Sequence, residues 1–214
     1  VSARRGRLHV TERLTDRGAD VVVLIDTHGQ APGPATQATE RTARGAAQVV
    51  QSALRNGDRA GIVALGGRQP RWLGPDIGRG QFYRVLDAVL GVGSEFETTT
   101  GTLAPRAAVP PGAIVVAFST LLSTEFALAL MELCKRGHTV VAVDVLEGAP
   151  FDAGFGADLA GELDPLIARM WALQRSAMYR DMSTIGVDVV HWRQAGPLAD
   201  AMRLVPDRHR LRRS

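Results

Sequence analysis

The sequence has little cysteine and few aromatic residues, and each shortage excludes a class of protein. The single cysteine, Cys134, excludes an intramolecular disulfide, a zinc site built from cysteines and an iron–sulfur cluster, and it fits a reducing compartment. Aromatic residues make up 5% of the chain and are not interleaved with the arginines, so no nucleic-acid-binding surface is expected on the folded body. No apolar stretch reaches the roughly 18 residues needed to cross a bilayer.

What the chain does contain is the composition of an ordinary globular domain. Hydrophobic residues make up 45% and charged residues 22%, which excludes wholesale disorder. With 214 residues the chain is long enough to bury a core of its own, and we expect a single domain over residues 1–214. The chain opens at Val1 without an initiator methionine or a signal-peptide pattern, so we expect it to be a piece of a longer protein.

The positive charge gathers at the two ends of the chain. The formal net charge is +3, and the arginines near the start together with those of a basic tail at 206–214 exceed this excess. Solvated termini are the simpler interpretation of these residues. Nucleic-acid binding through the tail is the alternative, and it predicts binding that weakens steeply with salt and is lost when the tail is removed.

Short apolar runs alternate with amphipathic stretches along the chain. Continuous apolar runs predict buried strands at 20–26, 59–65, 113–118, 139–145 and 187–191, and Pro70 places a further strand at 69–73 on the edge of the sheet. Helical spacing predicts helices near 43–54 and 82–90, then from a Ser123 cap to about 136, from 164 toward 186, and from 197 to about 204. The expected fold class is therefore α/β, with a doubly wound, mostly parallel sheet.

In such a sheet, ligands bind beyond the carboxyl ends of the strands. The polar residues that the sequence offers there are Asp26, Thr27, His28, Gln30, Ser119, Thr120 and Asp144, and the loop with Thr98, Thr99, Thr100 and Thr102 is placed to reach them. Glycine-rich phosphate loops and the Gly-x-Ser-x-Gly elbow of the α/β-hydrolases are missing. The histidines lack a metal-ligand spacing, and we interpret His138 and His191 as structural.

Three blocks in the first half of the chain resemble those of one protein family. They are the run from Ser2 to Arg13 followed by the strand from Ala19 to Asp26, the run Gly57–Val63, and Arg71–Pro75 with Gly78–Arg79. Taken in this order, they are similar to domain of unknown function family 58. The second half resembles the family only in the order of its strands and helices.

The resemblance implies a von Willebrand factor A-like fold and a role in protein interaction. Family members often carry two membrane helices before this region and a cytoplasmic soluble part, which implies that the chain is tethered to the inner side of the cell membrane. Their genes typically neighbour those of MoxR-type AAA+ ATPases. The implied role is a non-enzymatic adaptor or chaperone-like protein, with a MoxR-type ATPase or its client as the partner.

The resemblance also implies where a metal ion would bind. In von Willebrand factor A domains, an Asp-x-Ser-x-Ser element after the first strand binds Mg²⁺ through carboxylate and hydroxyl oxygens. Here these positions are Asp26, His28 and Gln30, so both serines are replaced, and Ser119 and Thr120 stand where an aspartate is usual. We expect a degenerate site and no cofactor, with Mg²⁺ as the cation that an intact site would take. The simpler interpretation of Asp26 is a carboxylate that caps nearby backbone N–H groups.

Two main hypotheses for the function remain open. The leading one is a protein-interaction module with a contact surface made of Asp26, Thr27, His28, Gln30, Thr98, Thr99, Thr100, Ser119 and Thr120. The alternative is a metal-assisted hydrolase or phosphoryl-transfer enzyme with Asp26 and Asp144 as paired carboxylates, which requires the two side chains to converge. Leu121 and Leu122 are either partly exposed at the contact surface or buried beneath the following helix.

Overall fold

The apolar runs of the sequence form one sheet whose central strands are parallel. The computed structural model describes residues 18–28, 34–66, 71–91, 104, 107–147, 164–193, 196–203 and 205. Its strands are β1 (Asp20–Asp26), β2 (Arg59–Leu65), β3 (Arg71–Asp76), β4 (Ile114–Ser119), β5 (Thr139–Asp144) and β6 (Asp188–His191). They lie in the order β3-β2-β1-β4-β5-β6, and every neighbouring pair is parallel except β2 with β3. The expected doubly wound, mostly parallel sheet is confirmed.

The antiparallel strand β3 lies at the edge of the sheet, as the proline in this region predicts. The strand begins at Arg71 and ends at Asp76, later than the expected 69–73, and residues 67–70 lie outside the described residues. The ladder shifts register between Ala60 and Ile62, opposite the stretch that contains Pro75. Because a bulge leaves one residue unpaired, the missing N–H of a proline is tolerated there.

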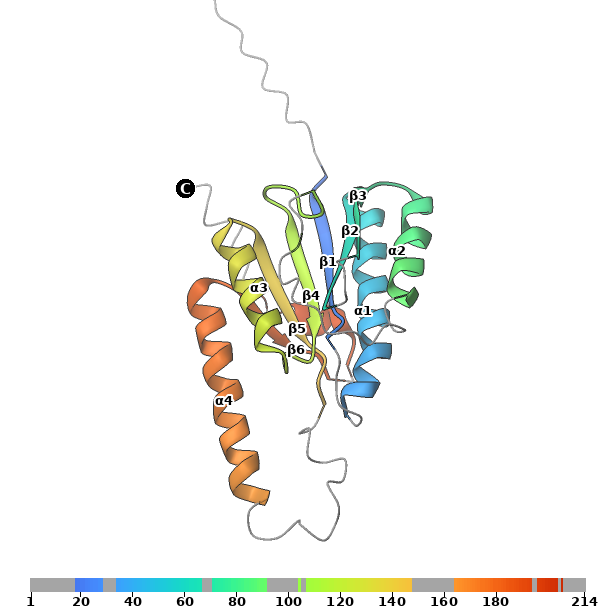
Figure 1. Cartoon of the computed structure of the whole chain (residues 1–214). Coiled ribbons are helices and arrows are strands. Elements are labelled where there is room, and N and C mark those ends of the chain that lie inside the picture. Colours follow the sequence, from blue (N-terminus) through green and yellow to red (C-terminus); the bar gives the residue numbers. More distant parts are fainter. Residues whose placement is uncertain are drawn as a thin grey trace, which may run out of the picture.

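Helices cover both faces of the sheet (Figure 1). The helices α1 (Pro34–Arg55), α2 (Arg79–Gly91) and the short α5 (Leu198–Met202) pack on one face, and α3 (Thr124–Lys135) and α4 (Asp164–Ile185) pack on the other. The predicted cap of α3 is confirmed, since the Ser123 hydroxyl accepts a hydrogen bond from the Phe126 N–H at 3.3 Å.

Alternation along the strands divides the core into two layers. In β4, for example, Val115 and Ala117 belong to the layer under α3 and α4, whereas Val116 and Phe118 belong to the layer under α1. The same alternation carries on to the polar residues that end the strands. It therefore decides which helices those residues meet.

Helix α4 is longer than the strands that it covers. Its 22 residues span about 33 Å, whereas the six residues of β5 span about 20 Å. Its N-terminal half therefore extends past the carboxyl ends of the strands, as Figure 1 shows. In the described part of the chain, no helix is long and apolar enough to cross a membrane.

Candidate functional site

Polar residues end four neighbouring strands at the carboxyl edge of the sheet. Ser119 of β4 pairs with Asp144 of β5, and Asp144 pairs with His191 of β6. Asp26 extends the β1–β4 ladder by one residue and stands beside Ser119. By the alternation of the strands, their side chains point toward α3 and α4. We call Asp26, Ser119, Asp144 and His191 the polar row.

The Asp26 carboxylate is buried, and both of its oxygens are occupied. Oδ1 accepts hydrogen bonds from the backbone N–H of His28 at 3.0 Å and from ring Nδ1 of the same residue at 2.7 Å. Oδ2 accepts from the Ser119 hydroxyl at 2.5 Å, and that hydroxyl accepts from the Leu121 N–H at 2.7 Å. The side chain of Asp26 is 1% exposed. Asp26 therefore caps the backbone N–H of His28, and it also binds the side chains of His28 and Ser119, which are far apart from each other in the sequence.

His28 is held by Asp26 and directs its second ring nitrogen outward. Nε2 lies 3.7 Å from a carboxylate oxygen of Glu125 in the first turn of α3, and the ring meets Phe126 edge-on. The hydrogen bond to Asp26 raises the pKa of His28 above its usual value, with burial opposing the rise and the charges of Asp26 and Glu125 adding to it. The contact between Asp26 and His28 is therefore strongest when the imidazole is protonated.

Asp144 is the centre of a second hydrogen-bonded group. Oδ1 accepts from the Arg175 guanidinium at 2.7 Å and from the Leu146 N–H at 3.1 Å. Oδ2 accepts from the Tyr179 hydroxyl at 2.7 Å and from the His191 ring at 3.0 Å. Because Asp144 is buried, this full set of donors compensates for the loss of water around its charge.

The charges in this group are fixed by their surroundings. Burial by itself would raise the pKa of Asp144, but hydrogen bonds from His191, Tyr179 and Arg175, together with the charge of Arg175, hold it below its usual value. Burial raises the pKa of Tyr179 far above its usual value, and the charge of Asp144 adds to the rise. Asp144 is therefore ionised and Tyr179 remains a donor at neutral pH.

Arg175 connects the Asp144 group to the Asp26 group. Its guanidinium donates to the carbonyl oxygen of Thr120 at 2.6 Å and to that of Leu121 at 3.2 Å, besides its bond to Asp144. Thr120 and Leu121 belong to the turn at 119–122, between β4 and α3, and this turn also supplies the Ser119 hydroxyl that binds Asp26. The polar network therefore runs through this turn from β1 to α4.

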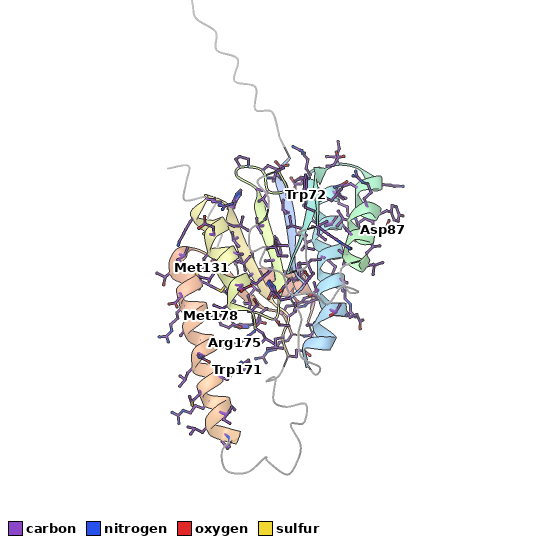
Figure 2. All side chains as sticks on the ribbon, in the orientation of Figure 1. Trp72, Asp87, Met131, Trp171, Arg175 and Met178 are labelled. Carbon is purple, nitrogen blue, oxygen red and sulfur yellow. The ribbon has the colours of Figure 1, made fainter. Side chains whose placement is uncertain are left out.

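Aromatic rings enclose the Arg175 guanidinium on α4. Its central carbon lies 5.3 Å from the centre of the Trp171 ring and 5.1 Å from that of Tyr179. Figure 2 shows Trp171 and Arg175 on successive turns of the same helix. These cation–π contacts, with a side chain only 10% exposed, hold the guanidinium in one orientation.

The turn at 119–122 has an unusual backbone. Leu121 has a φ of +52°, and among the described residues it is the only one besides glycine with a positive φ. This left-handed conformation costs a residue with a Cβ about 1–2 kcal/mol. Leu121 is buried and Leu122 is 38% exposed, so each of the two alternatives expected for this pair holds for one leucine.

The structure places some of the predicted contact residues together at the carboxyl edge. Ser119 and Thr120 are buried, whereas Thr27 and His28 are half-buried, and the Thr27 hydroxyl donates to a backbone carbonyl of β2 at 2.6 Å. The remaining predicted contact residues lie outside the described residues: Gln30, Thr98, Thr99 and Thr100. The basic tail at 206–214 also lies outside them.

The two aspartates of the enzyme hypothesis belong to separate groups. Strand β4 lies between β1 and β5, which sets the backbones of Asp26 and Asp144 about 10 Å apart, with Ser119 between them. Each carboxylate is occupied by its own donors. Within the described residues, the structure does not bring the two together around a shared metal or substrate.

The described residues of this edge do not fit a hard cation. Mg²⁺ needs several converging oxygens, but both oxygens of Asp26 accept hydrogen bonds, and an imidazole stands at His28 in place of a serine. In the part of the chain that the structure describes, no group of three His, Cys, Asp or Glu residues is placed to hold a metal ion. Among its described residues, the edge offers a hydrogen-bonded network.

Large apolar side chains are exposed beside this network. Leu122 lies in the turn that follows β4, and Leu128 lies on the outer face of α3. A larger group lies on the N-terminal half of α4, which extends past the sheet, and we call it the α4 apolar surface: Leu166, Ile167, Met170 and Leu173. Each of its members is about half exposed or more, with 48% for Ile167 and 62% for Met170.

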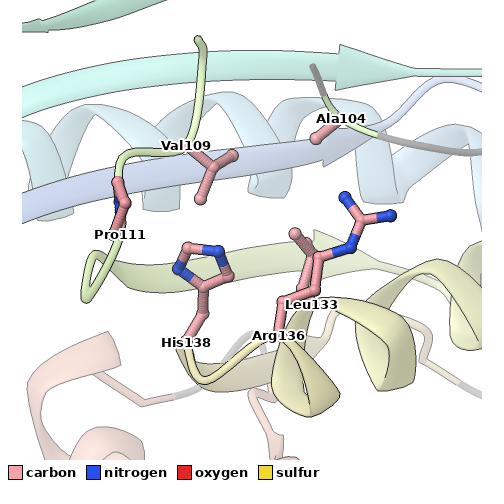
Figure 3. Close-up of a pocket in the computed structure, with 6 residues that line it drawn as sticks. All are labelled: Ala104, Val109, Pro111, Leu133, Arg136 and His138. Carbon is pink, nitrogen blue, oxygen red and sulfur yellow. The ribbon is translucent and has the colours of Figure 1, made fainter. Parts of the chain in front are cut away.

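A pocket of about 330 Å³ lies at the opposite, amino edge of the sheet (Figure 3). Its lining is mostly apolar, with His138 and Arg136 as the polar members. Burial lowers the pKa of His138, with a backbone hydrogen bond at Ala113 opposing the change and the charge of Arg136 adding to it. His138 stands just before β5, at the opposite end of this strand from Asp144.

Comparison with known proteins gives one family model and a solved structure that match the chain. A family model described as "Protein of unknown function DUF58" matches residues 1–152, more than half of the chain. The chain belongs to this family. The resemblance seen in the first half of the sequence is thereby confirmed. Among solved structures, the VWA domain of SpRpn10 matches with a TM-score of 0.45 and 14% sequence identity, over 88% of this chain and 95% of that one. No curated protein matches.

Several key residues of this DUF58 domain were not predicted from its sequence. Arg175 and Tyr179 meet Asp144 across more than 30 residues, and no local motif marks such a contact. Their spacing of four residues on one helix face is a signal, but it is shared by many helical pairs. The α4 apolar surface leaves a clearer trace, because apolar residues surround the first half of this helix instead of forming one stripe.

Proposed function

We propose that this DUF58 domain is a non-enzymatic protein-interaction module, an adaptor or chaperone-like partner of a MoxR-type AAA+ ATPase with a degenerate metal site. The α4 apolar surface carries the proposal. Soluble domains rarely expose contiguous apolar patches without a partner to cover them. Here the patch stands on a helix half that projects from the body, where a partner reaches it from several sides.

The non-enzymatic part of the proposal is supported by the state of the polar row. Asp26 and Asp144 are the two carboxylates that the enzyme hypothesis requires. Both are buried, and hydrogen-bond donors from the chain itself occupy all four of their oxygens. A catalytic carboxylate has to reach the substrate, whereas these two face partners inside the domain. Recognition through shape and apolar contact needs neither.

The choice of a MoxR-type ATPase, and of a position at the inner side of the cell membrane, rests on the resemblance to the family. The half-buried Thr27 and His28 and the partly exposed Leu122 extend the proposed contact surface from α4 onto the carboxyl edge. Ser119 and Thr120 then act from beneath this surface, since they are buried. We propose that metal is not required for recognition.

The test is a binding assay between the purified domain and a purified MoxR-type ATPase from the same organism. The double variant Met170→Ser/Leu173→Ser removes two exposed apolar contacts from the α4 apolar surface. If these contacts lie at the centre of the interface, we expect affinity to fall by at least tenfold. The matched control is Leu90→Ser on α2, which is 66% exposed on the opposite face, and it should bind like the original domain. Equal loss in both variants, or binding that requires Mg²⁺, contradicts the proposal.

A further inference from the structure

The contacts of Arg175 link the position of a helix to the conformation of a strained turn. Three of its acceptors lie on two different elements: the carbonyl oxygens of Thr120 and Leu121 in the turn at 119–122, and the carboxylate of Asp144 at the end of β5. A guanidinium presents its donors in a rigid fork, so it holds these groups in one arrangement. If α4 shifts, all three acceptors lose their donor together.

The turn has a reason to change conformation once it is released. Leu121 is held in a left-handed backbone conformation that residues with a Cβ avoid, and its φ is +52°. Two bonds hold it there: its N–H donates to the Ser119 hydroxyl, and its carbonyl accepts from Arg175. Without the second bond, a return to negative φ relieves the strain and withdraws the N–H from Ser119.

We propose that α4 acts as a latch on the carboxyl edge of the sheet, with Arg175 as the positioning residue that closes it. In the latched state, Ser119 is buried and its hydroxyl is bonded to Asp26. When α4 moves, the turn relaxes, the Ser119 hydroxyl loses the Leu121 N–H, and Ser119 and Asp26 become accessible. The edge thus has a closed state, seen here, and an open state that presents a carboxylate and a hydroxyl.

The helix is built so that an outside contact acts on this latch. Met170 and Leu173 of the α4 apolar surface lie within one and a half turns of Arg175 on the same helix. A protein that binds these side chains therefore acts on the helical segment that carries the Arg175 guanidinium. The latch goes beyond the proposed interaction role, since it describes what the domain does when α4 is displaced by any means.

The test is hydrogen exchange of individual backbone amides in the purified domain, with no partner present. Arg175→Lys keeps a positive charge beside Asp144 but loses the fork that reaches the turn. We expect the Leu121 amide to exchange at least tenfold faster, with the amides of Val115 and Val116 in β4 unchanged. Arg180→Lys, the same substitution at an exposed position of α4, is the control and should leave the Leu121 amide unchanged.

A second variant keeps the test decisive if Arg175→Lys weakens the whole fold. Ser119→Ala removes the acceptor of the Leu121 N–H and leaves Arg175 in place. In the double variant Ser119→Ala/Arg175→Lys, the Leu121 amide should exchange no faster than in the faster single variant, because both changes open the same turn. Three results would overturn the latch. The first is a double variant in which the two accelerations of Leu121 amide exchange multiply. The others are an unchanged Leu121 amide in Arg175→Lys and equal acceleration of the Leu121 and β4 amides. None of these results depends on whether an ATPase binds.

Discussion

Replacement of Asp144 by asparagine removes one buried charge at nearly constant volume. The loss leaves the Arg175 guanidinium, 10% exposed, without its counter-ion, and it turns one acceptor oxygen into a donor that faces other donors. Breaking a buried ion pair by removal of one partner costs about 3–5 kcal/mol. The whole domain is stabilised by about 5–15 kcal/mol, so Asp144→Asn should forfeit a large part of this free energy of unfolding.

Urea unfolding followed by circular dichroism measures this loss. Thermal unfolding should show the same loss as a lower melting temperature. For a chain of this size, each kcal/mol of lost stability lowers the melting temperature by about 2–4 °C, so we expect a decrease of roughly 6–20 °C. The m-value should not change, since the surface exposed on unfolding is the same. The control is Asp181→Asn, an exposed aspartate on the same helix, which should stay within about 0.5 kcal/mol of the original protein.

The dependence on pH follows from the lowered pKa of Asp144. A carboxylate with a lower pKa in the folded state stabilises the fold above its unfolded pKa of about 3.9, and this contribution disappears as pH falls through the folded pKa. The stability difference between the original protein and Asp144→Asn should therefore shrink in acid. A loss below about 1 kcal/mol at neutral pH, the value of an exposed ion pair, would refute the reasoning that the Asp144 group is buried and fully bonded.

Two further predictions test the packing around the sheet and the His28 contact. Because the pKa of His28 is raised in the folded state, its bond to Asp26 stabilises the protein fully below the unfolded pKa of about 6.5. This stabilisation is lost as pH rises through the folded pKa. In urea titrations, His28→Gln should therefore cost more stability near about pH 5.5 than near about pH 8.5. Gly45→Ala should destabilise the domain by about 1–3 kcal/mol in the same titrations, because the added Cβ would lie 2.3 Å from the Phe118 ring. Gly80→Ala in α2 is the control: its added Cβ meets open space, so this variant should be neutral or stabilising.

The strands of this fold could be predicted because their sequences satisfy one simple requirement. A central parallel strand is covered on both faces, so it reads as a continuous apolar run, and the runs at 20–26 and 59–65 coincide with β1 and β2 to the residue. Caps and breakers placed two helix ends as well: Ser123 caps α3, and α4 ends one residue before Gly186. The start of α1 was predicted wrongly, because this helix begins at Pro34, nine residues before the expected start at 43. The edge strand β3 begins two residues later than predicted, because a short antiparallel strand with a bulge has no continuous apolar run to mark it.

The candidate site could be predicted only in part. The positions of Asp26, Ser119 and Asp144 at the carboxyl edge follow from the parallel sheet alone. Their burial does not, because it depends on α4, whose Arg175 comes from a distant part of the sequence. The left-handed conformation of Leu121 is equally hidden, since it is imposed by tertiary hydrogen bonds on a residue that does not favour it.

The most direct test of the proposed function uses the methionines as reporters. The sequence has five, and Met170 is 62% exposed on the α4 apolar surface, whereas Met182 on the same helix is fully buried. We would record methyl NMR spectra of the methionine-labelled domain while a purified MoxR-type ATPase is added. The proposal predicts that the Met170 signal shifts or broadens first and that the Met182 signal keeps its position. A Met170 signal that is unchanged when the ATPase is bound would contradict the proposal that α4 carries the interaction.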